Sequence, residues 1–230
     1  FGDILLQNLL TGACYVWGMN GTSLATHGAV GWVPGTPWRA AGTGDANADG
    51  FADILLQDNA TGSCYLWGMD GSMAGSASVV AAASGFIGWT PGSIWRAVGM
   101  ADFTGDGKSD VLLQHGGTGD CYIWQLDGTR LVGNGFVGWT PGANWRAAGI
   151  GDFTGDGLAD IALQNSANGA VYLWALNGTA NGAASVIGTQ SGFIGWEPGA
   201  NWQVRDAGDY NGDGRSDILL QENATGALYA

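Results

Sequence analysis

Residues 51–71, FADILLQDNATGSCYLWGMDG, contain the pattern that decides the fold. The apolar stretch DILLQ predicts a β-strand that ends at the polar turn NATG. In CYLWGM, tyrosine and tryptophan alternate with cysteine and leucine, which puts the two pairs on opposite faces of a second strand. The pair Asp70-Gly71 is a strong signal for a two-residue hairpin turn. The segment therefore predicts consecutive antiparallel strands.

This segment is one of five copies, and the repetition organises the whole chain. The copies start at residues 1, 51, 108, 158 and 215, so their spacings alternate between 50 and 57 residues. They are FGDILLQN (1–8), FADILLQD (51–58), KSDVLLQH (108–115), LADIALQN (158–165) and RSDILLQE (215–222). Residues 1–230 therefore form one repeat array. Its units are approximately 1–50, 51–107, 108–157 and 158–214, with a partial unit at 215–230.

Each unit contains about four short strands and no helical periodicity. After the hairpin signal comes a stretch of variable length, then Pro-Gly and a last strand such as Trp95–Gly99. Four-stranded units of about 50 residues have the size of propeller blades. We expect an all-β fold of tandem four-stranded antiparallel blades, β-propeller-like, as either a closed larger propeller or an open repeat array.

The two ends of the sequence carry equivalent pieces of one unit, residues 1–16 and 215–230. An isolated piece of this kind exposes unpaired strand edges, which proteins normally cover or pair. We therefore expect the terminal segments to contact further copies or a continuation of the same array. In this hypothesis, residues 2–7 are positioned to receive an acidic loop.

Acidic loops between the units are the strongest chemical signal. In Asp45–Asp53, DANADGFAD, oxygen-bearing side chains stand at positions one, three, five and nine, with glycine at six. Calcium prefers six to eight oxygen ligands, and position seven can add its backbone carbonyl. Magnesium fits less well, and zinc or iron would call for histidine or cysteine. The sequence predicts about four Ca²⁺ sites, with ligands Asp45, Asn47, Asp49, Phe51, Asp53; Asp102, Thr104, Asp106, Lys108, Asp110; Asp152, Thr154, Asp156, Leu158, Asp160; and Asp209, Asn211, Asp213, Arg215, Asp217.

The alternative interpretation is that these loops are Asp/Gly turns without metal. Four copies in the same register favour calcium, and so does the charge. The formal net charge is −13, and three carboxylates within nine residues repel one another without a cation.

The same residues resemble a known repeat. Residues 101–114, ADFTGDGKSDVLLQ, are similar to the FG-GAP/VCBS repeat of integrin α-chain propellers, many secreted bacterial proteins and some fungal lectins. The resemblance covers essentially the whole chain. It implies that the loop joins the first two strands of a blade and binds Ca²⁺, and it implies an extracellular or cell-surface protein. Leu-Leu-Gln replaces the Gly-Ala-Pro that often follows, which points to the bacterial branch.

Twelve tryptophans recur at three positions per unit. Packing between blades is the favoured role for the Tyr-x-Trp pair. The Gly-Trp and Pro-Gly-x-x-Trp positions lie beside turns, where packing and a sugar- or protein-binding surface remain about equally favoured. These candidate ligand-binding residues are Trp32, Trp38, Trp89, Trp95, Trp139, Trp145, Trp196 and Trp202.

Several functional classes are disfavoured. The sequence has only 7 Lys and Arg residues but 20 Asp and Glu residues, which argues against binding of nucleic acid. No apolar run approaches the ~20 residues of a membrane helix. No Ser/His/Asp set, Cys/His pair or phosphate loop is present, so we expect no enzyme. Cys14, Cys64 and Cys121 align with Val171, which indicates a small buried slot rather than a redox or metal site. The Asn-x-Thr sequons are interpreted as turn chemistry.

Two functions from different classes remain open. The first is an extracellular, calcium-stabilised module for adhesion or for binding a glycan or protein. The second is a structural array that forms a cell-surface or extracellular assembly without a small ligand.

Overall fold

The computed structural model describes residues 3–72 and 78–230, which form five antiparallel sheets and almost no helix. This confirms the all-β prediction. The strands are β1 (Ile4–Gln7), β2 (Cys14–Asn20), β3 (Ser23–Val30), β4 (Trp38–Gly44), β5 (Asp53–Asp58), β6 (Cys64–Trp67), β7 (Gly85–Ile87), β8 (Trp95–Ala101), β9 (Asp110–His115), β10 (Cys121–Asp127), β11 (Arg130–Val137), β12 (Trp145–Gly151), β13 (Asp160–Asn165), β14 (Val171–Trp174), β15 (Gly192–Phe193), β16 (Trp202–Gly208), β17 (Asp217–Glu222) and β18 (Leu228–Tyr229). Two short 3-10 helices in the described segments are η2 (Ala81–Ala83) and η3 (Ala183–Ser185).

The sheets are the blades of a β-propeller arrangement. The three middle sheets each contain four strands in chain order, β4 to β7, β8 to β11 and β12 to β15. The first and last sheets contain three strands each, β1 to β3 and β16 to β18. Each middle sheet starts with the strand before the acidic loop, so the sheets are displaced by one strand from the sequence units.

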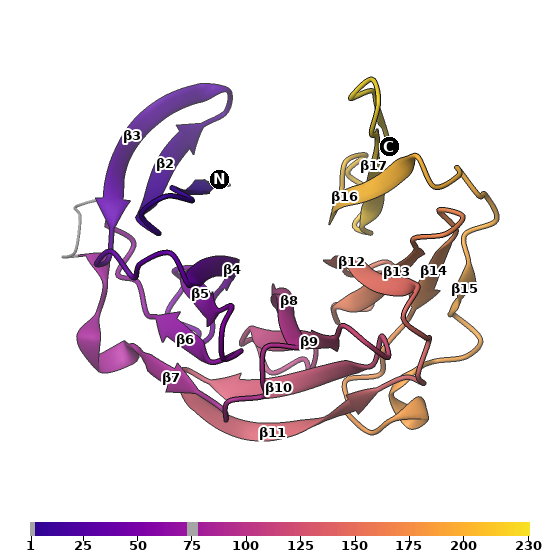
Figure 1. The fold of residues 1–230 in the computed structure, drawn as a ribbon, viewed down its shortest axis with the longest axis horizontal. Helices are drawn as coiled ribbons and strands as arrows, with labels where there is room; N and C mark the ends of the chain where they lie inside the picture. Colours follow the sequence, from indigo (N-terminus) through magenta and orange to yellow (C-terminus); the bar gives the residue numbers. More distant parts are fainter. Residues whose placement is uncertain (1–2, 73–77) are drawn as a thin grey trace.

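Five blades surround a common centre (Figure 1). Strands β4, β8, β12 and β16 lie nearest to the centre, and β3, β7, β11 and β15 lie at the outside. The first and last sheets face each other across an opening, so residues 3–16 and 215–230 belong to different blades. Gly2, the first residue of the segment predicted to receive an acidic loop, lies outside the described residues, as does Phe1.

The innermost strands approach one another closely. A Cβ atom on Gly42 of β4 would lie 3.0 Å from the Cα atom of Gly99 on β8, so any larger residue would require the neighbouring strand to shift. Each innermost strand also contains a β-bulge, as between Ala40 and Gly42 on β4. Bulges increase local twist and bend the strand. Glycine and bulge together allow the innermost strands to lie side by side around the centre.

The apolar core lies between neighbouring blades. Leu55 and Leu66 of the second sheet pack in one buried cluster with Met100, Val111 and Leu126 of the third. Equivalent clusters join the other neighbouring pairs. Each interface thus buries the inward side chains of two sheets, which is the main stabilising term for a repeat protein.

Three of the four tryptophans of the Tyr-x-Trp pairs belong to this core, whereas Trp17 on β2 is 40% exposed. Trp67, Trp124 and Trp174 are fully buried, which confirms the packing interpretation for them. Gly88 lies against the ring of Trp124 with a φ of +62°, and a Cβ atom there would be 3.0 Å from the ring. The glycine of the Gly-Trp motif is therefore required by the close approach of the loop to the next blade.

The cysteine slot is buried, as the sequence predicts. Cys14, Cys64, Cys121 and the aligned Val171 are each at most 1% exposed. Burial raises the pKa of the Cys14 thiol to about 11 and that of the Cys64 and Cys121 thiols to about 12. Since the thiolate is the reactive form, these groups are chemically inert at neutral pH.

Glutamine side chains connect neighbouring blades by hydrogen bonds. The Nε2 of Gln114 on β9 donates to the carbonyls of Gly119 (3.0 Å) and Trp145 (3.2 Å), and its Oε1 accepts the N–H of Ala147 (2.8 Å). Trp145 and Ala147 belong to β12 of the next sheet. The same pair of inter-blade bonds joins Gln7 to Trp38 and Ala40, Gln57 to Trp95 and Ala97, and Gln164 to Trp202 and Val204.

Candidate functional site

The predicted calcium loops join the first two strands of four blades. They are residues 45–52 between β4 and β5, 102–109 between β8 and β9, 152–159 between β12 and β13, and 209–216 between β16 and β17. All four lie at the same end of their sheets. This position is the one that the FG-GAP/VCBS resemblance implies.

The first aspartate of each loop organises the turn. Asp102 Oδ1 accepts the N–H of Gly105 (2.6 Å), and its Oδ2 accepts the N–H of Gly107 (2.8 Å). The loops that start at Asp152 and Asp209 repeat these bonds with their own glycines. The carboxylate therefore holds the turn closed around itself, and its remaining lone pairs stay available to a ligand.

The ninth aspartate has a structural role that sequence reasoning missed. Asp110 is fully buried; its Oδ2 accepts the N–H of Phe103 (3.2 Å), and its Oδ1 accepts the N–H of Leu126 (3.0 Å). Asp53 and Asp160 make the equivalent bonds. These carboxylates connect the loop to the end of the third strand of their own blade.

Burial also disfavours the charge on these carboxylates. It raises the pKa of Asp110 and of Asp160 to about 6, and the nearby charges of Asp106 and Asp156 add to the rise. Burial raises the pKa of Asp53 in the same way. A cation beside such groups would favour the charged form.

The loop side chains suit a hard cation chemically. In the fourth loop, Asn211 Nδ2 donates to Asp213 Oδ2 (3.2 Å) and to Asp217 Oδ1 (3.3 Å), so positions three, five and nine converge. The amide hydrogens lie between two carboxylates, where positive charge is favoured. The candidate metal ligands of all four loops are oxygen atoms, the ligands that Ca²⁺ prefers. Within residues 3–72 and 78–230, however, no three acidic, histidine or cysteine side chains are gathered closely enough to form a preformed metal site.

Position seven contributes packing through its side chain. Leu158 lies against Gly105 of the preceding loop, and Arg215 lies against Gly155. Lys108 instead forms an ion pair with Asp127, with Nζ and Oδ1 2.6 Å apart. Phe51 lies against Gly71 of the adjacent hairpin. A calcium ligand at this position would be the backbone carbonyl only.

Consecutive loops are also linked through their backbones. Ser109 N donates to the carbonyl of Asp45 (2.7 Å), Ala159 N to that of Asp102 (2.9 Å), and Ser216 N to that of Asp152 (2.7 Å). The first residue of each of the first three loops is thus hydrogen-bonded to the next loop along the chain.

The predicted tryptophans meet in three aromatic pockets at the opposite end of the sheets. Trp89 and Trp95 line one pocket of about 260 Å³ together with Pro91, Tyr122 and Phe136. Equivalent pockets of about 240 and 230 Å³ contain Trp32 with Trp38, and Trp139 with Trp145. Trp89 is 47% exposed and Phe136 is 51% exposed, so the aromatic faces are accessible. In the fourth copy, Trp196 and Trp202 lie near each other with ring centroids 6.5 Å apart.

Tyrosine and phenylalanine complete these pockets, and sequence reasoning did not include them. Tyr122 and Phe136 face each other on β10 and β11 with ring centroids 4.8 Å apart in an edge-to-face arrangement. Tyr172 pairs with Phe193 in the same way. The phenylalanine of the GF motif, which recurs as Phe86, Phe136 and Phe193, was the available signal.

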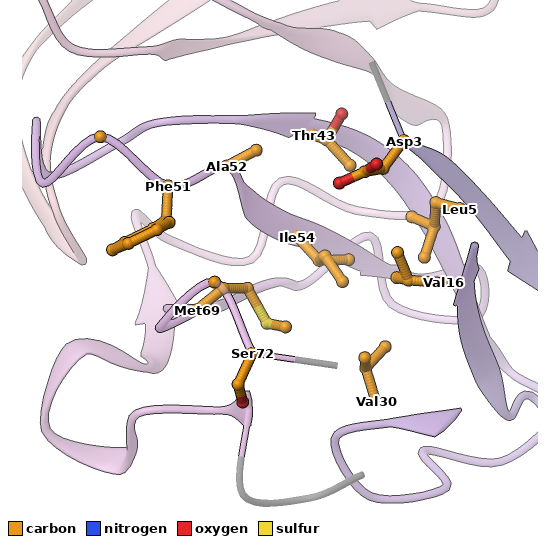
Figure 2. Close-up of a pocket in the computed structure, with 12 residues that line it drawn as sticks. Asp3, Leu5, Val16, Val30, Thr43, Phe51, Ala52, Ile54, Met69 and Ser72 are labelled. Atoms are coloured by element: carbon orange, nitrogen blue, oxygen red, sulfur yellow. The ribbon is translucent and has the colours of Figure 1, made fainter. Parts of the chain in front are cut away.

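A further cavity of about 580 Å³ lies between the first and second blades. Figure 2 shows Leu5, Val16 and Ile54 pointing into the same space. Thr43 lies opposite Ile54 in the ladder, where the next blades have Met100 and Ile150. Because Thr43 is smaller than Met100 and Ile150, it leaves more room in the cavity. The lining is mainly apolar and contains few groups that could bind a polar ligand or take part in catalysis.

A comparison with family patterns assigns the chain. FG-GAP-like repeats match three overlapping stretches, residues 45–113, 102–163 and 152–220, which together span more than half of the sequence. The chain belongs to the FG-GAP-like repeat family. FG-GAP-like repeats are typical of extracellular proteins. No helix among the described residues is long and apolar enough to cross a membrane.

Two solved structures share the fold of this FG-GAP-like protein. One is an Agrocybe aegerita lectin, described in terms of its specific recognition of non-reducing terminal N-acetylglucosamine; it has a TM-score of 0.54, 20% identity, and matches over 99% of this chain and 64% of the lectin chain. The other is the Tc holotoxin pore of Photorhabdus luminescens, with a TM-score of 0.57, 14% identity, and coverage of 98% of this chain and 11% of that chain. No curated protein sequence matches this chain.

One FG-GAP-like loop departs from the others at position four. Gly105, Gly155 and Gly212 occupy this position with φ of +77° to +81°, whereas the first loop has Ala48 with a φ of +60°. Ala48 is the only described non-glycine residue with positive φ. Alanine in this region costs about 1–2 kcal/mol.

We expect Ala48→Gly to raise the free energy of unfolding by about 0.5–1 kcal/mol, because relief of strain exceeds the extra flexibility of the unfolded chain. Ala52→Gly is the matched control in the same loop, and it should lower stability because its φ is not positive. Urea unfolding of the two variants measures both effects. A loss of stability in Ala48→Gly would show that the left-handed conformation is not strained.

Proposed function

We propose that this protein is a non-catalytic, extracellular carbohydrate-binding propeller whose blades are stabilised by Ca²⁺. The observation that carries the binding proposal is the repetition of one aromatic pocket in three consecutive blades, at similar volume and with exposed rings. Exposed tryptophan beside a shallow pocket is suited to stacking on the apolar face of a sugar ring.

Two further features support a sugar over a flat protein surface. The three pockets are separate and of similar size, about 230–260 Å³, so each suits a small unit of a larger ligand. The lectin-like structural neighbour is consistent with such a ligand. Several weak sites on one molecule would add avidity for a clustered glycan.

The calcium proposal rests on the loops. Four loops present oxygen donors in the same register, and three of the ninth-position carboxylates are buried where their charge is disfavoured without a neighbouring cation. Calcium bound there would stabilise the loop and, through it, the blade.

A double variant tests the binding proposal. After a glycan array has identified a ligand, Trp89→Ala combined with Phe136→Ala should reduce the calorimetric stoichiometry by one site and leave the remaining sites unchanged in affinity. The physical reason is that one pocket loses both of its exposed rings while the others keep theirs. Val132→Ala is the control, because Val132 is exposed on the same β11 strand but lies outside the pocket.

Two outcomes would contradict carbohydrate binding. One is an array without any hit for calcium-loaded protein. The other is a ligand whose stoichiometry does not change in the double variant. If native mass measurement then showed large homogeneous assemblies, the structural-array function would replace it.

A further inference from the structure

Arginines are concentrated on the innermost strands of this acidic protein. Four of the 7 lysines and arginines in the sequence lie there: Arg39 on β4, Arg96 on β8, Arg146 on β12 and Arg205 on β16. Figure 1 shows these four strands around the centre of the propeller. The net charge of the chain is −13, yet most of its basic residues lie on these four innermost strands.

Arg39 is held in place at the interface between the second and third blades. Its Nη2 donates to Gln57 Oε1 and to the carbonyl of Ala97, both at 2.6 Å. Gln57 belongs to β5, and Ala97 belongs to β8 of the next blade. The guanidinium group is therefore oriented by two acceptors, and its other N–H groups remain free for a ligand.

The arginines repel one another. Burial, with a smaller contribution from the charge of Arg96, lowers the pKa of Arg39 to about 10. Burial likewise lowers the pKa of Arg146, with contributions from Arg205 and Arg96. In the described part of the chain, ion pairs involve only Lys108, Arg130 and Asp127, so none of these four arginines has a carboxylate partner within 4 Å.

A polar pocket of about 230 Å³ contains two of them. Arg39 and Arg96 line it together with the polar side chains of Asn59 and Ser93. Asp58 also lines the pocket, but its Oδ1 accepts the backbone N–H groups of Ala60 (2.7 Å) and Thr61 (3.3 Å) and forms no ion pair. Two guanidinium groups and one carboxylate leave the pocket with a net positive charge.

We propose that the Arg39–Arg96 pocket binds an oxyanion: a sulfate, phosphate or carboxylate group. Two positive groups that line one cavity and form no ion pair there are stabilised by an anion between them, and guanidinium groups bind oxyanions by paired hydrogen bonds. The guanidinium group of Arg96 donates no hydrogen bond within the described residues, so its donors are available. The cavity is several times larger than the ~30 Å³ that one water molecule occupies in the liquid.

The oxyanion can come from a free inorganic ion or from an acidic sugar. Trp95 lines both this pocket and the second aromatic pocket, so the two are adjacent. A sugar ring on the aromatic pocket could therefore place an acidic substituent beside Arg39 and Arg96. This part rests on the proposed carbohydrate binding, whereas the anion site itself does not.

The first experiment titrates the folded, calcium-loaded protein with sodium sulfate by calorimetry, against sodium chloride at equal ionic strength. We expect saturable sulfate binding that is weakened about tenfold or more in Arg96→Gln, because one charge-assisted hydrogen-bond donor is lost. Arg96 is exposed and makes no bond that the fold needs, so this variant should remain folded. Arg130→Gln is the control, since Arg130 is exposed on β11 and pairs with Asp127. Absence of saturation, or equal affinity in Arg96→Gln and the unmodified protein, would overturn the proposal.

The second arm distinguishes the sources with a sulfated disaccharide and its desulfated form. Tighter binding of the sulfated sugar than of sulfate, lost in both Arg96→Gln and the Trp89→Ala/Phe136→Ala variant, identifies an acidic glycan. Equal binding of sulfate and sulfated sugar, unaffected by the aromatic variant, identifies a free ion. Sulfate binding without any sugar binding would support the anion site and reject the carbohydrate proposal. Sugar binding without sulfate binding would support the carbohydrate proposal and reject the anion site.

Discussion

Replacement of Gln114 with leucine is expected to lower the free energy of unfolding by about 3–6 kcal/mol. The carbonyls of Gly119 and Trp145 and the N–H of Ala147 each lose their partner, and a buried unpaired group costs about 1–3 kcal/mol. Leucine has a similar size but can make none of these bonds. Guanidinium unfolding followed by fluorescence and circular dichroism measures the loss.

Gln190→Leu is the matched control for this experiment. Gln190 is exposed, and only its backbone N–H makes a bond, to the carbonyl of Ile187. Its replacement should change stability by less than about 0.5 kcal/mol. Similar stability of the two variants would mean that the glutamine bonds between blades contribute little beyond the apolar contacts.

Removal of calcium is expected to have the other large effect. A ligand that binds only the folded state stabilises it by about 2.7 kcal/mol per site at a hundredfold excess over Kd. Asp106→Ala should therefore lower the melting temperature strongly in calcium and only slightly in chelator. In the chelator it loses a single exposed bond, from Lys108 N to Asp106 Oδ1 at 2.9 Å.

Asp70→Ala provides the control for the calcium experiment. Asp70 Oδ1 accepts the N–H of Ser72 (2.8 Å), the same kind of local bond, but Asp70 lies outside the predicted calcium loops. Its loss should be equal with and without calcium. Differential scanning calorimetry in calcium, magnesium and chelator separates the cases, and an equal loss for Asp106→Ala in all three would exclude a metal role for that residue.

Local patterns in the sequence were sufficient to predict the strands, the hairpins and the repeat. The patterns DILLQ and CYLW and the Asp-Gly turns determine the backbone conformation over only a few residues. In the structure, β5, β6, β9 and β10 form at these patterns. The position of the acidic loops followed from their register. Because every unit has the same order of strands, however, a repeat alone does not determine which strand begins a sheet.

Contacts between blades were harder to predict because they join residues 30 to 60 positions apart. Gln57 reaches Trp95 and Ala97, and Arg39 reaches Ala97, only because the innermost strands lie side by side. Tyr122 and Phe136 line the pocket that contains Trp89, and they lie opposite each other because of the register between β10 and β11. Composition and spacing contain no information about these distances until the sheets are placed around a centre.

At three of the borders between blades, the loop-to-loop bonds add a second set of hydrogen bonds to those of the glutamines. Ser109 ties the second acidic loop to Asp45 in the first, while Gln57 joins the same two blades at the opposite end of β5. If a single blade unfolded, the hydrogen bonds at both ends of its interface with the next blade would break. The apolar cluster between the two blades would then be exposed to water. In a linear array, the energy of such a border determines how far disorder spreads. Where hydrogen bonds join two blades at both ends of their interface, separating a folded blade from an unfolded neighbour requires a large free energy. Neighbouring blades are therefore expected to fold and unfold together.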